Sequence, residues 1–331
     1  MMAQDKVILV GDIGGTNARF AITDIDELSI MHFAALRCDM FPSLQAAIKA
    51  YMNSIPHRPS MAAFAIAGPV RSEVVRMINL PWSFSRADLR SVSGADTIHL
   101  VNDFEALAMV LPHLTAHDLH KLGGGEPVEG ATKVVLGPGT GLGVAGLVSS
   151  PSGWISVPGE GGHISFATED VEELAIREKM TGDKGHVSAE RMISGPGLVR
   201  LYQVLGQMKG FKPDPLSAAE IAARALGDKE NLAEEALGYF KTWLGRFAGD
   251  MALAYGAQGG VYLGGGMAPR IFDEAAASAF DLAFFHRAFQ AKGRLSAYLA
   301  SIPVYTIRAA DAGLRGAAVV LSAAIPARMS P

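Results

Sequence analysis

The feature that most constrains this chain is a strand–turn–strand pattern at residues 7–22. The apolar run Val7–Val10 enters a turn of sequence Gly-Asp-Ile-Gly-Gly-Thr-Asn at residues 11–17, and a second apolar run leaves it. Closely spaced glycines let the backbone approach an anion, and their N–H groups can hold phosphate oxygens. The Thr and Asn side chains add further donors. The pattern therefore indicates a phosphate-binding hairpin, with an ordinary hairpin turn as the alternative.

Asp12 is the unexpected residue of this turn, because a carboxylate repels phosphates unless a cation lies between them. We interpret Asp12 as a Mg²⁺ ligand that binds through water, since Mg²⁺ keeps much of its hydration shell. The turn matches neither GxxxxGK[ST] nor a helix-opening GxGxxG, so the usual nucleotide loops do not apply. If the turn is an ordinary one, Asp12 is simply solvated.

The same pattern occurs a second time. Lys133–Leu136 is an apolar run that leads into Gly-Pro-Gly-Thr-Gly-Leu-Gly at residues 137–143, and Val144–Val148 leaves the turn. A Thr again lies within the glycines. Two such patterns in one chain indicate two similar halves, each with a phosphate-binding hairpin.

Asn102 and Asp103 follow directly after the predicted strand Thr97–Val101 and open a helix. Open α/β sheets place their ligands at the carboxyl ends of strands, so this pair is a candidate binding or catalytic site. In the alternative interpretation Asp103 only caps the helix and Asn102 makes a turn.

Glu160 and His163 are flanked by glycines in the segment 158–166, which suggests a backbone held close to a ligand. A Glu–His pair could bind a metal, but no adjacent His or Cys completes such a site. Hydrogen bonding to a polyol fits this pair better, and a solvated loop is the alternative. Glu190 lies in the first turn of a helix that Ser188 caps, where the helix dipole alone would explain it.

A third strand runs into glycines at Gly260–Met267, and such a turn lets the flat ring of an adenosine lie against bare backbone. Leu119–Ala131 is rich in glycine and is predicted to be a loop and a candidate domain boundary. The pattern of apolar residues predicts a long core helix over Asn231–Tyr255. A helix is also predicted over residues 41–55 with Ser43 as its N-cap, and residues 272–291 are predicted to be mostly helical. Ser85 and Ser217 are predicted to form capping boxes at the starts of two further helices, the second of which reaches Leu226. Small residues dominate the terminal helix after Asp311, as in a helix that packs closely against another.

Composition excludes several classes of protein. The chain has 331 residues with a formal net charge of −4 and no long basic run, which argues against a nucleic-acid partner. Its one cysteine, Cys38, excludes an intrachain disulfide and a Cys₄ zinc site, and we expect a structural thiol there. The sequence contains no apolar run of about 18 residues and no leader-like segment, so we expect a cytoplasmic protein without a membrane partner.

Taken together, the order of these motifs resembles that of the sugar kinase/Hsp70/actin ATPase superfamily and, within it, the bacterial ATP-dependent glucokinases. The layout of motifs that resembles the superfamily spans the whole chain. The segments that match the glucokinases are residues 11–19, 102–106, 137–143, 160–163 and 190–191. The related ROK sugar kinases carry a cysteine-rich zinc motif, and a lone cysteine at position 38 does not fit that branch. No zinc is therefore expected.

The resemblance implies an α/β protein of two RNase H-like lobes, with a hinge and an active-site cleft between them. The small lobe would comprise residues 1–111 and 309–331, and the large lobe residues 112–308. It also implies a homodimer. The resemblance further implies ligands of glucose hydroxyls, of which Asp103 would also be the catalytic base: Asn102, Asp103, Glu160, His163, Glu190 and, on weaker grounds, Asn79. The residues expected to bind ATP are Gly11, Asp12, Ile13, Gly14, Gly15, Thr16, Asn17, Gly139, Thr140, Gly141, Gly264 and Gly265.

The implied reaction is transfer of the γ-phosphate of MgATP to the 6-hydroxyl of D-glucose, the entry step of glycolysis. A kinase for another hexose, such as mannose or an N-acetylated sugar, is an alternative, because the sequence does not set the tolerance at the 2-position. An actin-like or Hsp70-like ATPase with a binding role is the alternative outside sugar kinases. That alternative leaves the Glu160–His163 segment unexplained.

Overall fold

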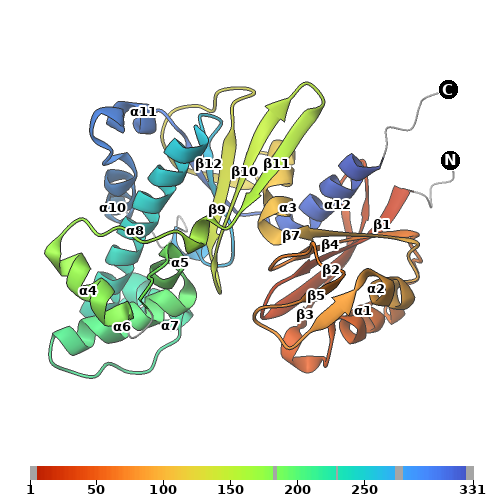
Figure 1. The fold of residues 1–331 in the computed structure, drawn as a ribbon, viewed down its shortest axis with the longest axis horizontal. Helices are drawn as coiled ribbons and strands as arrows, with labels where there is room; N and C mark the ends of the chain where they lie inside the picture. Colours follow the sequence, from red (N-terminus) through yellow and green to blue (C-terminus); the bar gives the residue numbers. More distant parts are fainter. Residues whose placement is uncertain (1–5, 182–184, 229, 273–278, 326–331) are drawn as a thin grey trace. The chain divides into compact units, whose positions relative to one another are not determined.

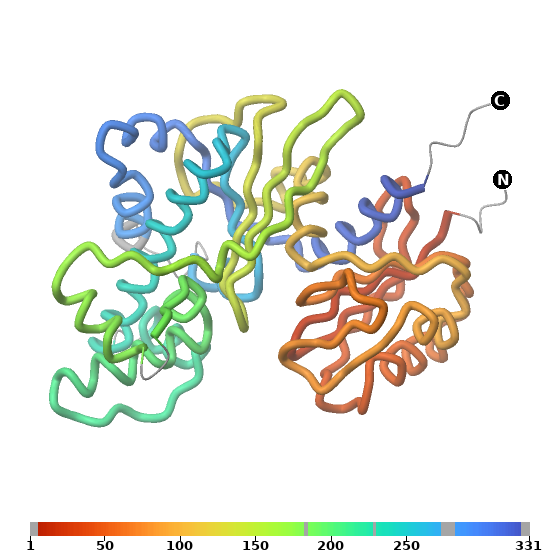
Figure 2. The backbone as a smooth tube through the Cα atoms, in the orientation of Figure 1, coloured from red at the N-terminus to blue at the C-terminus, as the bar shows by residue number. Residues whose placement is uncertain are grey.

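The structure is a computed structural model that describes residues 6–181, 185–228, 230–272 and 279–325. The chain divides into two compact units. Unit 1 comprises Met1–Leu114 and Ala309–Pro331, and unit 2 comprises Thr115–Arg308. Figure 2 shows the C-terminal segment, in blue, rejoining the N-terminal unit.

Unit 1 contains a five-stranded sheet of order β3-β2-β1-β4-β7 (Figure 1). Strands β1, β2 and β3 are antiparallel neighbours, whereas β1, β4 and β7 run parallel. The elements of unit 1 are β1 Val7–Ile13, β2 Asn17–Asp24, β3 Ile30–Arg37, α1 Leu44–Asn53, β4 Met61–Ile66, β5 Val74–Arg76, β6 Ser83–Ser85, α2 Arg86–Ser93, β7 Thr97–Asn102, α3 Asp103–Val110 and α12 Ala312–Ala324.

Helices cover both faces of this sheet, because both faces of its central strands are apolar. Leu9 and Ile13 of β1 belong to a core shared with α1 and α2, while Ile8 and Val10 belong to a second core shared with α3 and α12. The alternation of side chains along a strand therefore assigns each residue of β1 to one helix pair. A Cβ on Gly316 would lie 2.1 Å from the carbonyl oxygen of Ala106, so α12 and α3 pack closely, as the small residues predicted.

Unit 2 contains a six-stranded sheet of order β11-β10-β9-β12-β13-β8. The elements of unit 2 are β8 Leu119–Gly123, β9 Lys133–Pro138, β10 Leu142–Ser150, β11 Gly153–Gly159, α4 Val171–Thr181, α5 Ala189–Met192, α6 Gly195–Met208, α7 Ala218–Ala223, α8 Asn231–Tyr255, β12 Val261–Leu263, α9 Ala268–Ile271, α10 Ala279–Gln290, α11 Ser296–Ala300 and β13 Val304–Ile307.

The two sheets share one topology. In each, a glycine hairpin (β1–β2 or β9–β10) is extended by an antiparallel strand on one side and by two parallel strands on the other. Strand β8 is an addition at the far edge of the second sheet, antiparallel to β13. This repetition confirms the two similar halves that the repeated glycine pattern predicted, and the α/β class with RNase H-like units that the resemblance implied.

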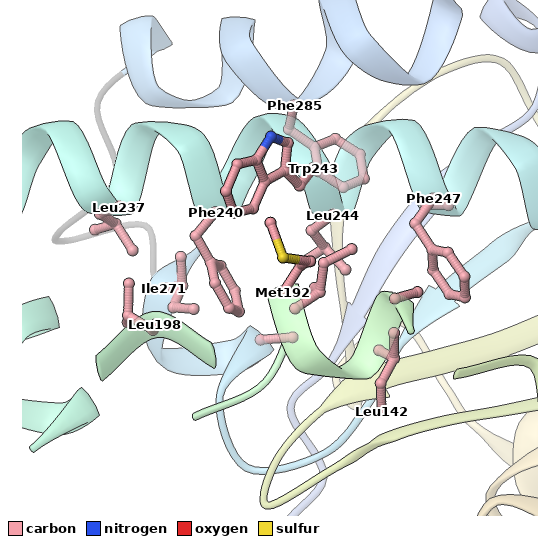
Figure 3. Close-up of a cluster of buried hydrophobic side chains, with 14 of the residues drawn as sticks. Leu142, Met192, Leu198, Leu237, Phe240, Trp243, Leu244, Phe247, Ile271 and Phe285 are labelled. Carbon is pink, nitrogen blue, oxygen red and sulfur yellow. The ribbon is translucent and has the colours of Figure 1, made fainter. Parts of the chain in front are cut away.

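The core of unit 2 is built around α8, which spans the 25 residues predicted for it. Phe240, Leu244 and Phe247 point from α8 toward Met192 of α5 and Leu142 of β10 (Figure 3). Helix α10 packs along α8 at glycines, since a Cβ on Gly245 would lie 2.3 Å from a carbonyl oxygen of α10. The apolar stripe on α8 is therefore core, as predicted. Among the described residues, no helix is both long and apolar enough to span a membrane.

Three strands were not predicted, of which the three-residue β6 pairs with β5 in a separate two-stranded sheet. Leu119–Gly123, expected to be a loop, is the edge strand β8; it is short and partly polar, and its pairing with β13 decides its conformation. Strand β3 is also an edge strand, whose exposed side chains give no apolar pattern and whose His32 has a φ of +51°. Strand pairing is non-local, so none of these strands has a clear local signal.

Helix ends follow the predicted local signals in most places. Ser43 caps α1, although this helix begins later and ends earlier than the predicted range 41–55. The capping boxes predicted at Ser85 and Ser217 are both present. The helix after Ser217 was predicted to reach Leu226, but α7 ends at Ala223 and continues as a turn of π-helix. Part of the helix predicted over residues 272–291 lies outside the described residues, and α10 occupies the rest.

Candidate active site

In unit 1 the site is organised by three parallel strands that end in one row. Ile13 of β1, Ile66 of β4 and Asn102 of β7 are partners across the sheet. Asp12 and Asp103 therefore lie at the same edge, at the carboxyl ends of β1 and β7. This edge is where open α/β sheets bind ligands, as predicted for the Asn102–Asp103 pair.

Asp12 points toward the start of α12. It shares the face of β1 that packs against α3 and α12, and a Cβ on Gly313 would lie 2.9 Å from its Cγ. Arg19, its partner across the β1–β2 hairpin, donates to Asp12 Oδ2 at 2.9 Å. Burial raises the pKa of Asp12, and the charge of Arg19 offsets this only in part. Asp12 is therefore a largely buried carboxylate with one cationic neighbour, not the solvated residue of an ordinary turn.

The turn between β1 and β2 is held by backbone contacts. The N–H of Gly14 donates to the carbonyl of Asn17 at 3.0 Å, and the N–H of Cys38 donates to the carbonyl of Thr16 at 2.9 Å. The buried thiol of Cys38 lies 3.6 Å from the carbonyl oxygen of Gly14, as expected for a structural cysteine. A Cβ on Gly11 would lie 2.5 Å from the ring of Phe64, so packing alone requires this glycine.

Asn102, and not Asp103, caps α3. The Asn102 Oδ1 atom accepts from the N–H groups of Phe104 and Glu105 at 2.9 and 3.2 Å, and its amide donates to the carbonyl of Gly68 at 3.4 Å. Asp103 is the first helical residue and accepts from the N–H of Phe104 at 3.0 Å. Burial, and then the charge of Asp12, raise the pKa of Asp103 to about 7. A carboxylate with this pKa can exchange a proton near neutral pH.

In unit 2 two of the predicted sugar ligands, Glu160 and His163, lie on one exposed loop. The side chains of Glu160 and His163 are 79% and 59% exposed, and Glu160 Oε2 lies 3.9 Å from His163 Nε2. The carbonyl oxygen of His163 lies 3.1 Å from Nε2 of His186, within hydrogen-bonding distance. The sequence did not indicate this contact. Exposed side chains on a loop that glycines hold in place suit a ligand that binds from solvent.

Glu190 lies beside the second glycine hairpin. Its Oε2 atom accepts from the N–H of Leu142 at 2.9 Å, and a Cβ on Gly141 would lie 2.4 Å from the same oxygen. Ser188 caps α5, as predicted. Because Glu190 also binds the N–H of Leu142, the helix dipole is not the only explanation for a glutamate at this position. The contact joins residues that are far apart in sequence, and no local pattern indicates it.

A cavity of about 1040 Å³ lies beside this hairpin, within unit 2. Gly139 and Thr140 form one part of its wall, and Gly266 another. Gly264 and Gly265 lie behind the wall, where a Cβ on Gly265 would lie 3.0 Å from the carbonyl oxygen of Pro138. Helices α6 and α7 supply wall residues that sequence reasoning did not assign, among them Val199, Gln203, Ala218 and Ala222.

The residues present fit Mg²⁺ in one respect only. Two carboxyl side chains, Asp12 and Asp103, lie at this edge of the sheet, and Mg²⁺ is commonly bound by one or two carboxylates together with water and substrate phosphates. Among the described residues, no group of three or more His, Cys, Asp or Glu side chains could hold a metal ion. Asn79, a weaker expectation, lies in an exposed bend after β5, and its neighbour Ile78 is within 3.8 Å of a Cβ placed on Gly68.

Comparison with known proteins identifies the family of this chain. The model of the glucokinase family matches residues 9–324. The chain is 42% identical to a glucokinase of Cronobacter sakazakii, over 94% of this chain and 96% of that protein. It is 44% identical to a glucokinase of Aromatoleum aromaticum, over 96% of this chain and 95% of the relative.

A solved structure supports the same conclusion. The crystal structure of a glucokinase from an Antarctic psychrotroph superposes with a TM-score of 0.80 at 34% identity, and covers 96% of this chain and 99% of its own. The match of fold, order of motifs and sequence extends over nearly the whole length. The chain therefore belongs to the glucokinase family of kinases.

Proposed function

We propose that this protein transfers the γ-phosphate of MgATP to the 6-hydroxyl of glucose, with Asp103 as the general base. The observation that carries the proposal is the position of Asp103. It lies at the carboxyl end of a parallel strand, on the sheet edge that also carries the first glycine hairpin, and its pKa is about 7. A base of this pKa is half ionised near neutral pH, where proton transfer by a positioned side chain is most effective.

In the proposed reaction the sugar 6-oxygen attacks the γ-phosphorus in line with the leaving oxygen of ADP. Asp103 accepts the hydroxyl proton as this attack proceeds. Phosphoryl transfer passes through a loose, highly charged transition state, so positioning and electrostatic stabilisation supply most of the rate enhancement. Mg²⁺, when bound, would neutralise charge on the phosphates beside Asp12.

The two glycine hairpins have the same role in this proposal. Residues 11–17 and 139–141 would donate backbone N–H groups to the phosphates. The adenosine would occupy the cavity of about 1040 Å³ beside Gly139 and Gly266, a volume at the upper end of that of small-molecule sites. The glucose hydroxyls would be bound by Asn102, Asp103, Glu160, His163 and Glu190, with Asn79 as a weaker candidate.

Glucose is the sugar favoured by the family, since the relatives that match over nearly the full length are named glucokinases. A solved glucokinase of Balamuthia mandrillaris, in complex with glucose, has the same fold with a TM-score of 0.83 at 23% identity. A cytoplasmic location fits a chain with one cysteine, which needs no oxidising compartment to fold. A homodimer is also proposed, and light scattering coupled to gel filtration would measure it.

The decisive experiment is a coupled assay of ADP release from MgATP, with and without glucose. Asp103→Asn is the test variant, and Asp96→Asn is its control, because Asp96 is an exposed residue just before the other end of β7. Loss of a general base should lower kcat by about 10²–10⁴-fold with a modest change in the KM of glucose. The control should retain full activity.

Two results would overturn the proposal. ATP hydrolysis that no sugar stimulates would indicate the motion-coupled ATPase instead. Near-normal kcat in Asp103→Asn would exclude Asp103 as the base. A panel of hexoses in the same assay would distinguish glucose from mannose and N-acetylated sugars.

A further inference from the structure

The peptide group of Leu142 is held from two sides in unit 2. Its N–H donates to Glu190 Oε2 at 2.9 Å, and its carbonyl oxygen lies 2.0 Å from where a Cβ of Gly162 would be. Only a glycine at position 162 permits this approach. Leu142 follows the turn of the second glycine hairpin as the first residue of β10, whereas Gly162 lies between the predicted sugar ligands Glu160 and His163.

The loop that carries these sugar ligands is also tied to the helix that carries Glu190. The N–H of Ala189 donates to the carbonyl of Ile164 at 2.9 Å, and the N–H of Phe166 donates to the carbonyl of Val187 at 2.9 Å. These two hydrogen bonds flank the antiparallel β-bridge between Ser165 and Ser188. The loop therefore has little freedom to move without α5. A displacement of the loop therefore reaches Glu190.

The turn of the second glycine hairpin also contacts the wall of the cavity proposed to hold the nucleotide. The carbonyl of Gly139 accepts from the N–H of Gly195, the first residue of α6, at 2.8 Å. Both glycines line the cavity, while the side chain of Leu142 is anchored in the core near Met192 of α5 (Figure 3). The hairpin is thus held between a rigid core, the cavity wall and the sugar loop.

We propose that the Leu142 peptide couples the sugar loop to the phosphate hairpin of unit 2, with Glu190 as the positioning residue. The inference rests on the proposed function, because it takes glucose to bind at the loop and the nucleotide to bind in the cavity. One carboxylate oxygen of Glu190 holds Leu142, and the other accepts a sugar hydroxyl. A bound sugar then restricts the Glu190 side chain, and the hairpin that this side chain holds loses residual motion before the nucleotide binds.

This coupling has a thermodynamic consequence. If glucose orders the hairpin, the nucleotide loses less conformational freedom on binding, so glucose and nucleotide should each tighten the affinity for the other by the same factor. Couplings of this kind are typically about 5–150-fold. The factor should depend on Glu190, and on its hydrogen bond to Leu142 in particular.

The experiment is hydrogen–deuterium exchange of the full-length protein, read on peptides that cover residues 139–144 and 160–166, with and without saturating glucose. The variants are Glu190→Ala, which removes the acceptor, Glu190→Gln, which keeps an acceptor oxygen, and Glu234→Gln as a control on the exposed start of α8. Titration calorimetry with MgADP, with and without glucose, supplies the coupling factor for each variant.

We expect glucose to slow exchange in both segments of the wild-type protein. Without glucose, Glu190→Ala should speed exchange of the Leu142 amide about tenfold, as one lost hydrogen bond would, while Glu190→Gln should stay near wild type. The coupling factor should fall to within about twofold of one in Glu190→Ala and persist in Glu190→Gln and Glu234→Gln. If Glu190→Ala does not fold, Glu190→Asp, which withdraws the carboxylate, takes its place.

The outcomes separate this inference from the proposed function. Absence of any effect of glucose on residues 160–166 would overturn the proposed sugar site, and the coupling with it. Protection of 160–166 without protection of 139–144 would leave the sugar site standing and refute the coupling. An unchanged coupling factor in Glu190→Ala would likewise refute the role of Glu190.

Discussion

Asp103 has a conflict between stability and function. The start of a helix favours the ionised form of Asp103, whereas burial and the charge of Asp12 favour the neutral form. Burial and Asp12 prevail, since the pKa of Asp103 is raised to about 7. Asn102 satisfies the cap of α3, so the Asp103 side chain is not needed for the helix. A buried acid that its own helix does not require is typical of a functional site.

The raised pKa of Asp103 predicts a pH-dependent cost in stability. Between about pH 4 and pH 7, native Asp103 keeps a proton that the unfolded chain releases, so the stability of the wild type falls as pH rises through this window. Asp103→Asn cannot ionise. Its free energy of unfolding should therefore exceed that of the wild type by a margin that grows by at most about 1.4 kcal/mol per pH unit and levels off above pH 7.

Urea denaturation of Asp103→Asn and wild type at pH 5, 6, 7 and 8 would measure this margin. The kcat/KM of the wild type should fall on the acid side of pH 7, where the base becomes protonated. A margin that is the same at every pH would show that Asp103 titrates as an ordinary exposed carboxylate.

At the scale of single elements, the first turn of α12 contains a glycine, Gly313, that a helix alone would not favour. Replacement of glycine by alanine within a helix usually stabilises a protein by about 0.5–1 kcal/mol. Gly238 of α8 is a matched position, since a Cβ there meets nothing within 4 Å. At Gly313 a Cβ would lie 2.9 Å from Asp12 Cγ. The glycine therefore makes room for the carboxylate at the start of the helix.

We expect Gly313→Ala, but not Gly238→Ala, to impair activity. Gly238→Ala should gain about 0.5–1 kcal/mol of stability at full activity. Gly313→Ala should displace Asp12 and lower kcat/KM for MgATP at least about tenfold, as a misplaced ligand does. Thermal unfolding and initial rates at varied Mg²⁺ would measure both. Equal activity of the two variants would show that the position of Asp12 does not matter.

Helices α4 and α8 are joined by a buried ion pair. Arg246 Nη1 and Nη2 each donate to one oxygen of Glu173 at 2.8 Å, and the indole of Trp243 donates to the same carboxylate at 3.0 Å. Burial favours the neutral acid, but the hydrogen bonds and charge of Arg246 outweigh it, so the pKa of Glu173 lies below its ordinary value. Phe166, at the end of the sugar loop, packs edge-on against Trp243.

Removal of one partner should cost more than removal of both. Arg246→Met leaves a buried carboxylate uncompensated, which typically costs about 3–5 kcal/mol, whereas Arg246→Met with Glu173→Met should recover more than half of this loss. The Trp243 indole stays without its acceptor in the double variant, so recovery should be incomplete. A double-mutant cycle by chemical denaturation measures the difference, and additive losses would contradict it.

At the scale of the whole molecule, each unit has its own sheet and its own hydrophobic core. The chain passes between the units twice, near residues 114–115 and 308–309. Independent cores joined by few connections are what relative motion of domains requires. A kinase also needs to exclude water when ATP reacts, since an open site would waste phosphoryl groups on hydrolysis.

We therefore expect glucose to make the protein more compact. Small-angle X-ray scattering with and without saturating glucose should show a smaller radius of gyration in its presence. A sugar that is not phosphorylated, added at the same concentration, is the control. An unchanged radius of gyration with bound glucose would remove closure from the mechanism.

The sequence by itself determined the features that depend on neighbours along the chain. The glycine hairpins, the helix caps at Ser43 and Ser188 and the long helix α8 follow from spacing and residue type over a few turns, so they could be predicted. The repeat of the hairpin was enough to predict two similar units. The order of motifs was enough to predict the family.

Only the tertiary structure decided the contacts between residues that are far apart in the chain. It places Asp12 against Gly313 and joins Glu190 to Leu142 by a hydrogen bond. It also makes β8 a strand and builds one wall of the cavity from α6 and α7. Each of these depends on which elements pack together, and the free energy that selects the packing is a sum over the whole core. No window of sequence contains that sum, which is why candidate residues could be named from the sequence and their geometry could not.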